Sequence, residues 1–297
     1  MKCLLLSVLS AWGLAAQTVP PTGQAVAGLE AYDQAMLQLT AKYQIPGAAL
    51  AVARDGRLVM ARGYGYADRD AKTLVQPDSL FRIFSISKPI TALATYKLVE
   101  QGKLRLDAKA FQILSRLKPP TGQTQDPRLQ LITIQHLLDH EGGWDINALG
   151  FDPVGQSTRA AQVVGVTPPA SAEVVIRYML GIPLNFDPGR KSVYSNFGYS
   201  VLGRVIEEVS GMSYETFVKT NVFGPLGITR TAVGHTLQAD RFPGEVTYYF
   251  PGLVPSVFPN VTGLVPWPYG GFLHRGMGLV WWVGVKHDGS TTVPCLG

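Results

Sequence analysis

Apolar residues recur at helical spacing in several segments of the chain, and the clearest of these segments runs from Phe84 to Gly102. Its regularly spaced apolar positions are Ile90, Leu93, Ala94 and Leu98. Pro89 suits a first helical turn, where its missing N–H costs no hydrogen bond, and Gly102 is a natural end. The pattern therefore predicts a buried helix over residues 84–102.

The chain before this helix carries the pattern of a helix followed by a hairpin. Residues 26–44 have apolar positions at helical spacing, and Ile45-Pro46-Gly47 ends the segment. Residues 48–53 and 57–63 flank Asp55-Gly56, a strong hairpin signal. Gly63 and Gly65 are interpreted as the end of this hairpin. A short extended piece over 80–83 then leads into the helix, so we expect a sheet with a helix packed against it.

The chain after this helix is predicted to be mainly helices and loops. Thr133 is expected to cap a short helix over 134–139, and further helices are predicted over 171–180 and 197–210. Residues 245–285 are rich in proline, glycine and aromatic residues, and residues 276–283 read as a strand. The C-terminal part is therefore expected to return to the sheet.

Composition indicates a well-buried globular protein. The 297 residues are 46% apolar and 16% charged, which suits a large core. The net charge of +5 is spread thinly, with no basic run beyond pairs such as Arg190-Lys191. We therefore expect no binding to nucleic acid or to a membrane surface.

The first sixteen residues, MKCLLLSVLSAWGLAA, have the features of a secretory signal. A lysine precedes an apolar run too short for a spanning helix, and small residues follow it. An uncleaved anchor is the alternative. Cleavage would remove Cys3 and leave only Cys295, so no internal disulfide is expected. The predicted location is the periplasm or the cell exterior, with no stable membrane insertion after cleavage.

Ser85 and Lys88 stand three residues apart at the start of the predicted helix, so their side chains would share a face. A serine hydroxyl is a poor nucleophile until a base takes its proton, and burial can depress the pKa of a lysine toward the working range. The alternative is a helix cap beside a solvated lysine, because Ser-x-x-Lys often arises by chance. Ser115 to Lys118 also fits the spacing, but this segment runs into Pro119-Pro120.

Tyr194-Ser195-Asn196 lies at a predicted junction between a loop and a helix. In near-extended backbone, residues two apart point the same way, so Tyr194 and Asn196 are expected to face one cleft. A phenol beside an ammonium can act as a base, and an amide can bind both Lys88 and a substrate carbonyl. Alternatively, Tyr194 is a packing aromatic and Asn196 is the helix cap.

His136 and His140 are four residues apart, a spacing that can place two metal ligands on one helical face. The sequence has no HExxH motif and no obvious third ligand. We interpret both histidines as structural, and we expect neither a metal nor another cofactor.

Four motifs in order resemble those of the β-lactamase-related serine hydrolases, a group of class C β-lactamases, similar esterases and D-alanyl-D-alanine carboxypeptidases. The motifs are Ser85-Ile86-Ser87-Lys88, LLDHEGG at 137–143, Tyr194-Ser195-Asn196 and FVKTNVFGPLGITRT at 217–231. The similarity runs from about residue 28 to 290. One departure is Glu141, where a threonine is usual after the histidine, and we expect it to affect loop packing more than chemistry.

The resemblance implies an α/β (α+β) fold of the β-lactamase/transpeptidase-like type, with an antiparallel sheet flanked by helices beside an all-helical region. The domain would span 26–297, with sheet parts over about 26–84 and 245–297 and the helical region over about 103–240. By resemblance, Ser85 is the acylated nucleophile, Lys88 and Tyr194 share proton transfer, and Asn196 orients Lys88 and the substrate. Which of Lys88 and Tyr194 is the base stays open.

The same resemblance implies a Lys-or-His, variable, Gly triplet on a strand that lines the cleft, and His287-Asp288-Gly289 is the candidate. The N–H groups of Ser290 and Ser85 would form an oxyanion hole, each donor contributing roughly 3 kcal/mol. His287 would meet a substrate carboxylate or leaving group. A simple Asp-Gly hairpin turn is the alternative.

Members of this family continue beyond the triplet with further strands and a covering helix, whereas this chain ends eight residues after Gly289. We therefore expect the sheet to lack its C-terminal cover and to expose an edge that favours oligomer formation.

The sequence thus predicts a secreted serine hydrolase whose partner is a small-molecule ester, amide or β-lactam. Esters and small peptide-like amides are favoured over β-lactams, because Lys-Thr-Gly usually grips the antibiotic carboxylate and Asp288 would oppose it. One rival is a class C-like β-lactamase, and the other is a non-catalytic or degenerate penicillin-binding-like protein. The α/β-hydrolases are disfavoured because the chain lacks a Gly-x-Ser-x-Gly elbow.

Overall fold

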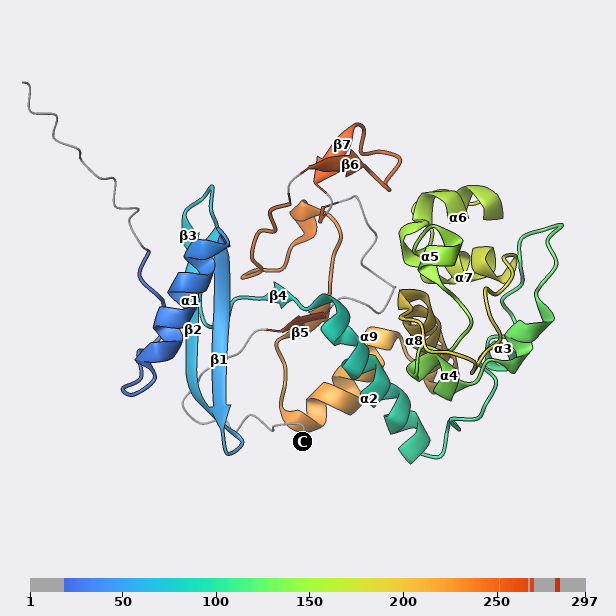
Figure 1. Cartoon of the computed structure of the whole chain (residues 1–297), viewed down its shortest axis with the longest axis horizontal. Coiled ribbons are helices and arrows are strands. Elements are labelled where there is room, and N and C mark those ends of the chain that lie inside the picture. Colours follow the sequence, from blue (N-terminus) through green and yellow to red (C-terminus); the bar gives the residue numbers. More distant parts are fainter. Residues whose placement is uncertain (1–18, 251, 267, 270–280, 284–297) are drawn as a thin grey trace, which may run out of the picture.

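The computed structural model describes residues 19–250, 252–266, 268–269 and 281–283. A sheet part carrying α1 and the helical region lie on opposite sides of the long central helix α2 (Figure 1). Helices and antiparallel strands are mixed as the sequence predicted. The predicted signal over 1–16 and the triplet His287 to Gly289, with Ser290, lie outside the described residues.

The N-terminal helix and hairpin form as predicted. Helix α1 spans Glu30–Lys42 and lies across the hairpin of β1, Gly47–Arg54, and β2, Arg57–Asp68 (Figure 1). The two strands pair antiparallel around Asp55 and Gly56, which take the positive φ angles of 50° and 72° that such a tight turn requires. A short strand β3, Thr73–Leu74, pairs with the other edge of β2.

The pairing of β1 with β2 ends at Gly47 and Gly65, as predicted for the end of the hairpin. Strand β2 itself continues past both glycines to Asp68, so the strand end predicted at Gly63 is wrong. Gly63 lies within the strand, where the N–H of Thr22 donates to its carbonyl at 2.9 Å. A Cβ at this position would lie 2.3 Å from the carbonyl oxygen of Val75. This glycine therefore permits a close backbone approach rather than a turn.

The predicted central helix begins with one 3-10 turn, η1, Phe84–Ile86, and continues as α2, Ser87–Glu100. Ala94 and Leu98 are fully buried in the helical core, as the apolar pattern predicted. Leu93 is 38% exposed, because α2 packs against the core along only one of its faces.

A second sheet joins three short strands that are far apart in the sequence. Strand β8, Trp281–Val283, pairs antiparallel with β4, Phe81–Arg82, on one side and with β5, Thr231–Val233, on the other. Strand β5 lies inside the range that we expected to be helical only, since three residues are too few for a recognisable alternation. Strand β8 coincides with the end of the strand predicted over 276–283.

A small antiparallel ribbon of β6, Leu253–Pro255, and β7, Leu264–Pro266, stands apart from both sheets (Figure 1). In the part of the chain that is described, no helix combines the length and the apolar character needed to cross a bilayer.

The helical region supplies most of the buried apolar side chains. Its α-helices are α3, Ala110–Ile113; α4, Ile134–Leu138; α5, Ile146–Leu149; α6, Ser157–Val164; α7, Ala172–Leu180; α8, Asn196–Ser210; and α9, Tyr214–Val218. Short 3-10 turns are η2, Pro127–Leu131; η3, Pro153–Gly155; η5, Gly224–Leu226; and η6, Gln238–Asp240, and η4, Lys219–Phe223, is a π-turn. The buried stripe of α8 packs against α2, which fixes the start of α8 beside the start of α2.

A buried ion pair connects β4 to the chain beyond the helical region. The Nε of Arg82 donates to Glu245 at 3.2 Å, and neither side chain is accessible to solvent. The same guanidinium donates to the carbonyl oxygens of Pro268 at 2.8 Å and His235 at 3.0 Å. Arg82 thereby anchors these segments two residues before Phe84.

Candidate active site

Ser85 is exposed at the N-terminal end of the central helix, within the 3-10 turn η1. The preceding residue, Phe84, has a φ of 43°, in the left-handed region that non-glycine residues occupy at a cost of about 1–2 kcal/mol. This backbone turns the chain sharply between β4 and α2. Such strain is typical of functional sites, where the surrounding structure maintains an unfavourable local geometry.

Lys88 is 5% exposed and lies one turn further along, with its amine directed at three oxygen atoms. Its Nζ donates to Ser85 Oγ at 3.2 Å, to Tyr194 Oη at 2.5 Å and to Asn196 Oδ1 at 2.7 Å. As an ammonium, Lys88 donates one N–H to each of the three oxygens, whereas as a neutral amine it donates two and turns its lone pair to the third. The structure thus brings together all four of these sequence-predicted residues.

Tyr194 connects the serine and the lysine directly. Its Oη lies 2.5 Å from Ser85 Oγ, and either atom can be the donor. A proton leaving the serine therefore has two acceptors within reach, the phenol oxygen and the amine. The Tyr194 side chain is 48% exposed, so it lies at an open surface rather than in the core.

Asn196 is the first residue of α8 but does not cap it. The cap is Ser195, whose hydroxyl accepts the N–H of Gly198 at 3.0 Å. The alternative interpretation of Asn196 as the helix cap is therefore wrong, and its amide is left to bind other side chains. One end of that amide meets Lys88, and the Nδ2 end donates to Asp152 Oδ2 at 2.6 Å.

The side chain of His140 packs against Tyr194 and hydrogen-bonds the backbone of the next residue. It has a φ of 60°, and its Nδ1 accepts the N–H of Ser195 at 3.1 Å. Its ring lies against Tyr194, with 4.9 Å between centroids, and against Tyr199, with 5.0 Å. Burial, and after it the positive charge of Lys88, lowers the pKa of His140 below its usual range. A neutral imidazole is required for Nδ1 to accept this bond.

His136 has a separate structural task. Its Nδ1 accepts the N–H of Thr133 at 3.3 Å, and the Thr133 hydroxyl accepts the N–H of His136 at 3.0 Å. This reciprocal pair caps α4 as the sequence predicted for Thr133. Within the described ranges, no group of three His, Cys, Asp or Glu side chains is placed to hold a metal ion.

Sequence reasoning missed Asp152 and the role of His140 beside the tyrosine. Asp152 precedes Pro153 at the start of a 3-10 turn, so the sequence suggests only a local cap. The unusual Glu141 takes part in the loop through its backbone, because its N–H donates to His136 at 2.7 Å and its carbonyl accepts from Gly189 at 3.0 Å. The expected oxyanion donor Ser290, with His287 and Gly289, lies outside the described residues.

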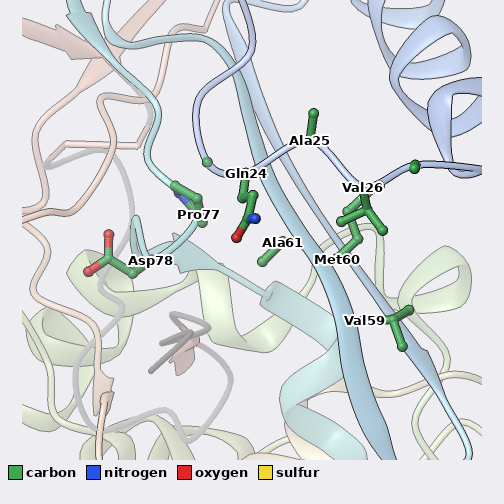
Figure 2. A pocket seen from close by; sticks show the side chains of 10 residues that line it. Gln24, Ala25, Val26, Val59, Met60, Ala61, Pro77 and Asp78 are labelled. Atoms are coloured by element: carbon green, nitrogen blue, oxygen red, sulfur yellow. The ribbon is translucent and has the colours of Figure 1, made fainter. Parts of the chain in front are cut away.

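A separate hollow of about 630 Å³ lies beside β2, lined by the chain before α1 and by Pro77 and Asp78 (Figure 2). None of its lining residues belongs to the group around Ser85. Its polar side chains are Gln24 and Asp78, and Asp78 is paired with Arg230. None of the residues that line this hollow is a serine, a threonine or a cysteine.

Comparison with known proteins gives a family match over most of the chain. The family model described as Beta-lactamase matches residues 32–272. Esterase EstB from Burkholderia gladioli is 34% identical over 203 residues, which cover 66% of this chain and 48% of the esterase. A penicillin-binding protein from Bacillus subtilis (strain 168) is 32% identical over 217 residues, 73% of this chain and 43% of that protein.

A solved structure gives the same result for the fold. The octameric penicillin-binding protein homologue from Pyrococcus abyssi superimposes with a TM-score of 0.63 at 26% identity, covering 87% of this chain and 54% of that one. The chain spans about half or less of the length of the curated relatives described above.

Proposed function

The chain belongs to the Beta-lactamase family, and we propose that it is a serine hydrolase that forms an acyl-enzyme on Ser85. The observation that carries the proposal is the contact of Ser85 Oγ with Tyr194 Oη at 2.5 Å and with Lys88 Nζ at 3.2 Å. An exposed serine with two adjacent proton acceptors is the arrangement that nucleophilic catalysis requires.

In the proposed reaction, Ser85 Oγ attacks the substrate carbonyl carbon while its proton passes to Tyr194 Oη or Lys88 Nζ. The tetrahedral intermediate collapses as the carbon–leaving-group bond breaks, and the same pair returns the proton to the leaving alcohol or amine. A water molecule then attacks the acyl carbon and gives one proton to the pair. The bond between that carbon and Ser85 Oγ breaks, Oγ takes the proton back, and the carboxylic acid leaves. Asn196 holds Lys88 in place and meets the substrate carbonyl.

We propose carboxylic esters or small peptide-like amides as the substrates. The esterase among the relatives supports this class, and Asp288 within the His287 to Gly289 triplet disfavours a β-lactam carboxylate by charge repulsion. The oxyanion donors in this proposal are the N–H groups of Ser85 and Ser290, and His287 would meet a substrate carboxylate or the leaving group.

The second candidate function is covalent penicillin binding without efficient turnover, or a class C-like β-lactamase activity. The penicillin-binding relatives favour it, since their names state what those proteins bind. The two candidates share the acylated Ser85 and differ in the fate of the adduct.

Intact-mass spectrometry with a fluorophosphonate and with a labelled penicillin tests the proposal. Folded wild-type protein should gain the mass of one fluorophosphonate adduct, and Ser85→Ala should gain none. Ser115→Ala is the matched control, because Ser115 is exposed and opens the chain's other Ser-x-x-Lys segment. Absence of any adduct on the wild type would reject a catalytic serine. A persistent penicillin adduct would favour the second candidate, whereas rapid p-nitrophenyl ester turnover would favour the first.

We also propose that the protein is exported by its first sixteen residues to the periplasm or the cell exterior. The apolar run after Lys2 and the small residues Gly13, Ala15 and Ala16 support this proposal. N-terminal sequencing of the expressed protein should give a start at Ala16 or Gln17, and an intact Met1 on exported protein would contradict it.

We also propose that copies of the protein associate through β1. Within the described chain, β1 pairs along one edge with β2, and a hollow of about 440 Å³ lies against Gly47 to Ala51 and Phe81. An apolar strand edge recruits further strands, so a second copy is the proposed occupant. Light scattering should show an oligomer that Leu50→Lys reduces to a monomer, and a monomeric wild type would contradict this.

A further inference from the structure

We propose that Asp152 is a positioning residue that fixes the amide orientation of Asn196, so that Oδ1 rather than Nδ2 faces Lys88. The inference rests on the proposed role of Lys88 in proton transfer. Asp152 reaches the site from the segment between α5 and α6, away from the starts of α2 and α8, where the other four residues lie.

The contacts form a continuous chain of hydrogen bonds. Asn196 Nδ2 donates to Asp152 Oδ2 at 2.6 Å, and Lys88 Nζ donates to Asn196 Oδ1 at 2.7 Å. The other carboxylate oxygen of Asp152 accepts the N–H of Val154 at 3.2 Å. Both ends of the amide and both oxygens of the carboxylate therefore have partners.

The chemistry of the two partners permits one orientation of the amide. A lysine ammonium only donates, and an ionised carboxylate only accepts. Rotating the Asn196 amide by half a turn would set an N–H group against the ammonium and a carbonyl oxygen against the carboxylate. Asp152 thus selects the rotamer in which Lys88 keeps its acceptor.

The carboxylate is itself held rigidly. Asp152 caps the 3-10 turn η3, whose Pro153 and Val154 side chains are buried. Proline fixes its own backbone φ, so the residue before it is also restricted. A rigid support is what a site needs to keep catalytic groups within hydrogen-bonding geometry.

The test compares three variants by ester hydrolysis and by penicillin acylation. Asp152→Ser retains a capping hydroxyl for η3 but is too short to reach Asn196, so kcat should fall about 10- to 100-fold with KM within about threefold. Asp152→Asn should lower kcat as much. The amide at position 152 can donate an N–H to the carbonyl oxygen of Asn196 and so stabilise the reversed orientation of the Asn196 amide. Asp145→Ser is the matched control, since Asp145 caps α5 and pairs with Lys191. It should keep wild-type rates.

The double variant Asp152→Asn with Asn196→Asp should recover about tenfold over the single Asp152→Asn variant. In it, a new amide at 152 donates to a new carboxylate at 196, which again offers an oxygen to Lys88. A wild-type kcat in Asp152→Ser would overturn the proposal, as would failure of the double variant to exceed the single one.

Amide NMR tests the same contact without reference to activity. The side-chain N–H resonance of Asn196 should lie downfield in the wild type and return toward the free-amide position in Asp152→Ser. An unchanged resonance would overturn the role of Asp152 even if Ser85 is not acylated. Conversely, a shifted resonance together with no adduct on Ser85 would reject the proposed function and leave the positioning contact established.

Discussion

The imidazole of His140 lies against the phenol ring of Tyr194, with 4.9 Å between the two centroids and 35° between the ring planes. Its Nδ1 also accepts the N–H of Ser195, the next residue along the chain, at 3.1 Å. One side chain therefore fixes both the ring of the tyrosine and the backbone that carries it. Because the bond needs a neutral imidazole, this support depends on pH.

The stability of the protein should fall as the pH drops below about 6.5. Burial and the charge of Lys88 lower the pKa of His140 in the folded protein from its ordinary value of 6.5. Above pH 6.5 the imidazole of His140 is neutral in both the folded and the unfolded protein, so its contribution to stability is fully present. Below it the unfolded chain gains a proton that the folded protein resists, at up to about 1.4 kcal/mol per pH unit, until the folded pKa is passed.

Urea unfolding between pH 7.5 and 5 measures this effect. His140→Asn is the comparison, because asparagine tolerates a positive φ and does not titrate. His136 also has a lowered pKa through burial and is present in both proteins, so the difference in slope reports His140. Identical pH slopes in the two proteins would show that His140 is not protonated on unfolding.

Tyr194→Phe should lower kcat by about 100- to 10,000-fold with little change in stability. The substitution removes the oxygen that contacts Ser85 and Lys88 and keeps the ring that His140 packs against. Because Tyr194 is half exposed, water can replace its hydroxyl as an acceptor for the buried Lys88. Steady-state ester hydrolysis and thermal unfolding provide the two measurements.

Tyr199→Phe should lower the stability of the protein and leave its activity nearly unchanged. The Tyr199 hydroxyl donates to the carbonyl of Leu138 at 3.1 Å in the buried core, so its loss should cost about 1–2 kcal/mol of stability. Its activity should stay within about threefold of wild type when assayed well below the melting temperature. Equal kinetic losses in both variants would argue against a direct role for the Tyr194 hydroxyl.

Arg82→Met should destabilise the fold by about 3–5 kcal/mol. It leaves the fully buried carboxylate of Glu245 without the guanidinium and removes the donors to the carbonyl oxygens of Pro268 and His235. Urea unfolding measures the loss. Adding Glu245→Gln should recover part of it, because the buried charge then disappears as well. A single variant as stable as the wild type would show that this ion pair does not hold β4.

The central helix and its reactive pair were predictable because their signals are local. A three-residue spacing places Ser85 and Lys88 on one face of a helix, and alternation places Tyr194 and Asn196 on one side of a loop. The two pairs come together only because α2 packs against α8. Local spacing does not encode that packing, and the family resemblance predicted it. The four-residue group was thus predicted by combining both kinds of information.

Asp152 and the packing of His140 were beyond prediction because the partners are distant in the chain. Asp152 lies 44 residues before Asn196, and a capping aspartate has the same local pattern whether or not its second oxygen binds elsewhere. Strand β5 escaped detection because a three-residue strand is specified by its partner β8 rather than by its own alternation. The end of β2 was placed too early, at Gly63, because a glycine is equally typical of a turn and of a close backbone contact.

Gly63→Ala should therefore destabilise the protein by roughly 1–3 kcal/mol. The added Cβ would lie 2.3 Å from the Val75 carbonyl oxygen and 2.6 Å from the Thr22 hydroxyl oxygen, both closer than any ordinary contact. To avoid these two overlaps, the chain around Thr22 or the segment after β3 must move away from β2. Thermal unfolding measures the loss, and the exposed ends of these segments should also become more sensitive to protease.

Gly203→Ala in the middle of α8 is the matched control, and its expected effect has the opposite sign. A Cβ there meets Tyr214 at 3.9 Å, an ordinary contact, and alanine is the better helix former by about 0.5–1 kcal/mol. The two substitutions add the same methyl group, so their difference isolates the space around Gly63. If both variants gained stability, the close approach of the Val75 carbonyl to Gly63 would be wrong.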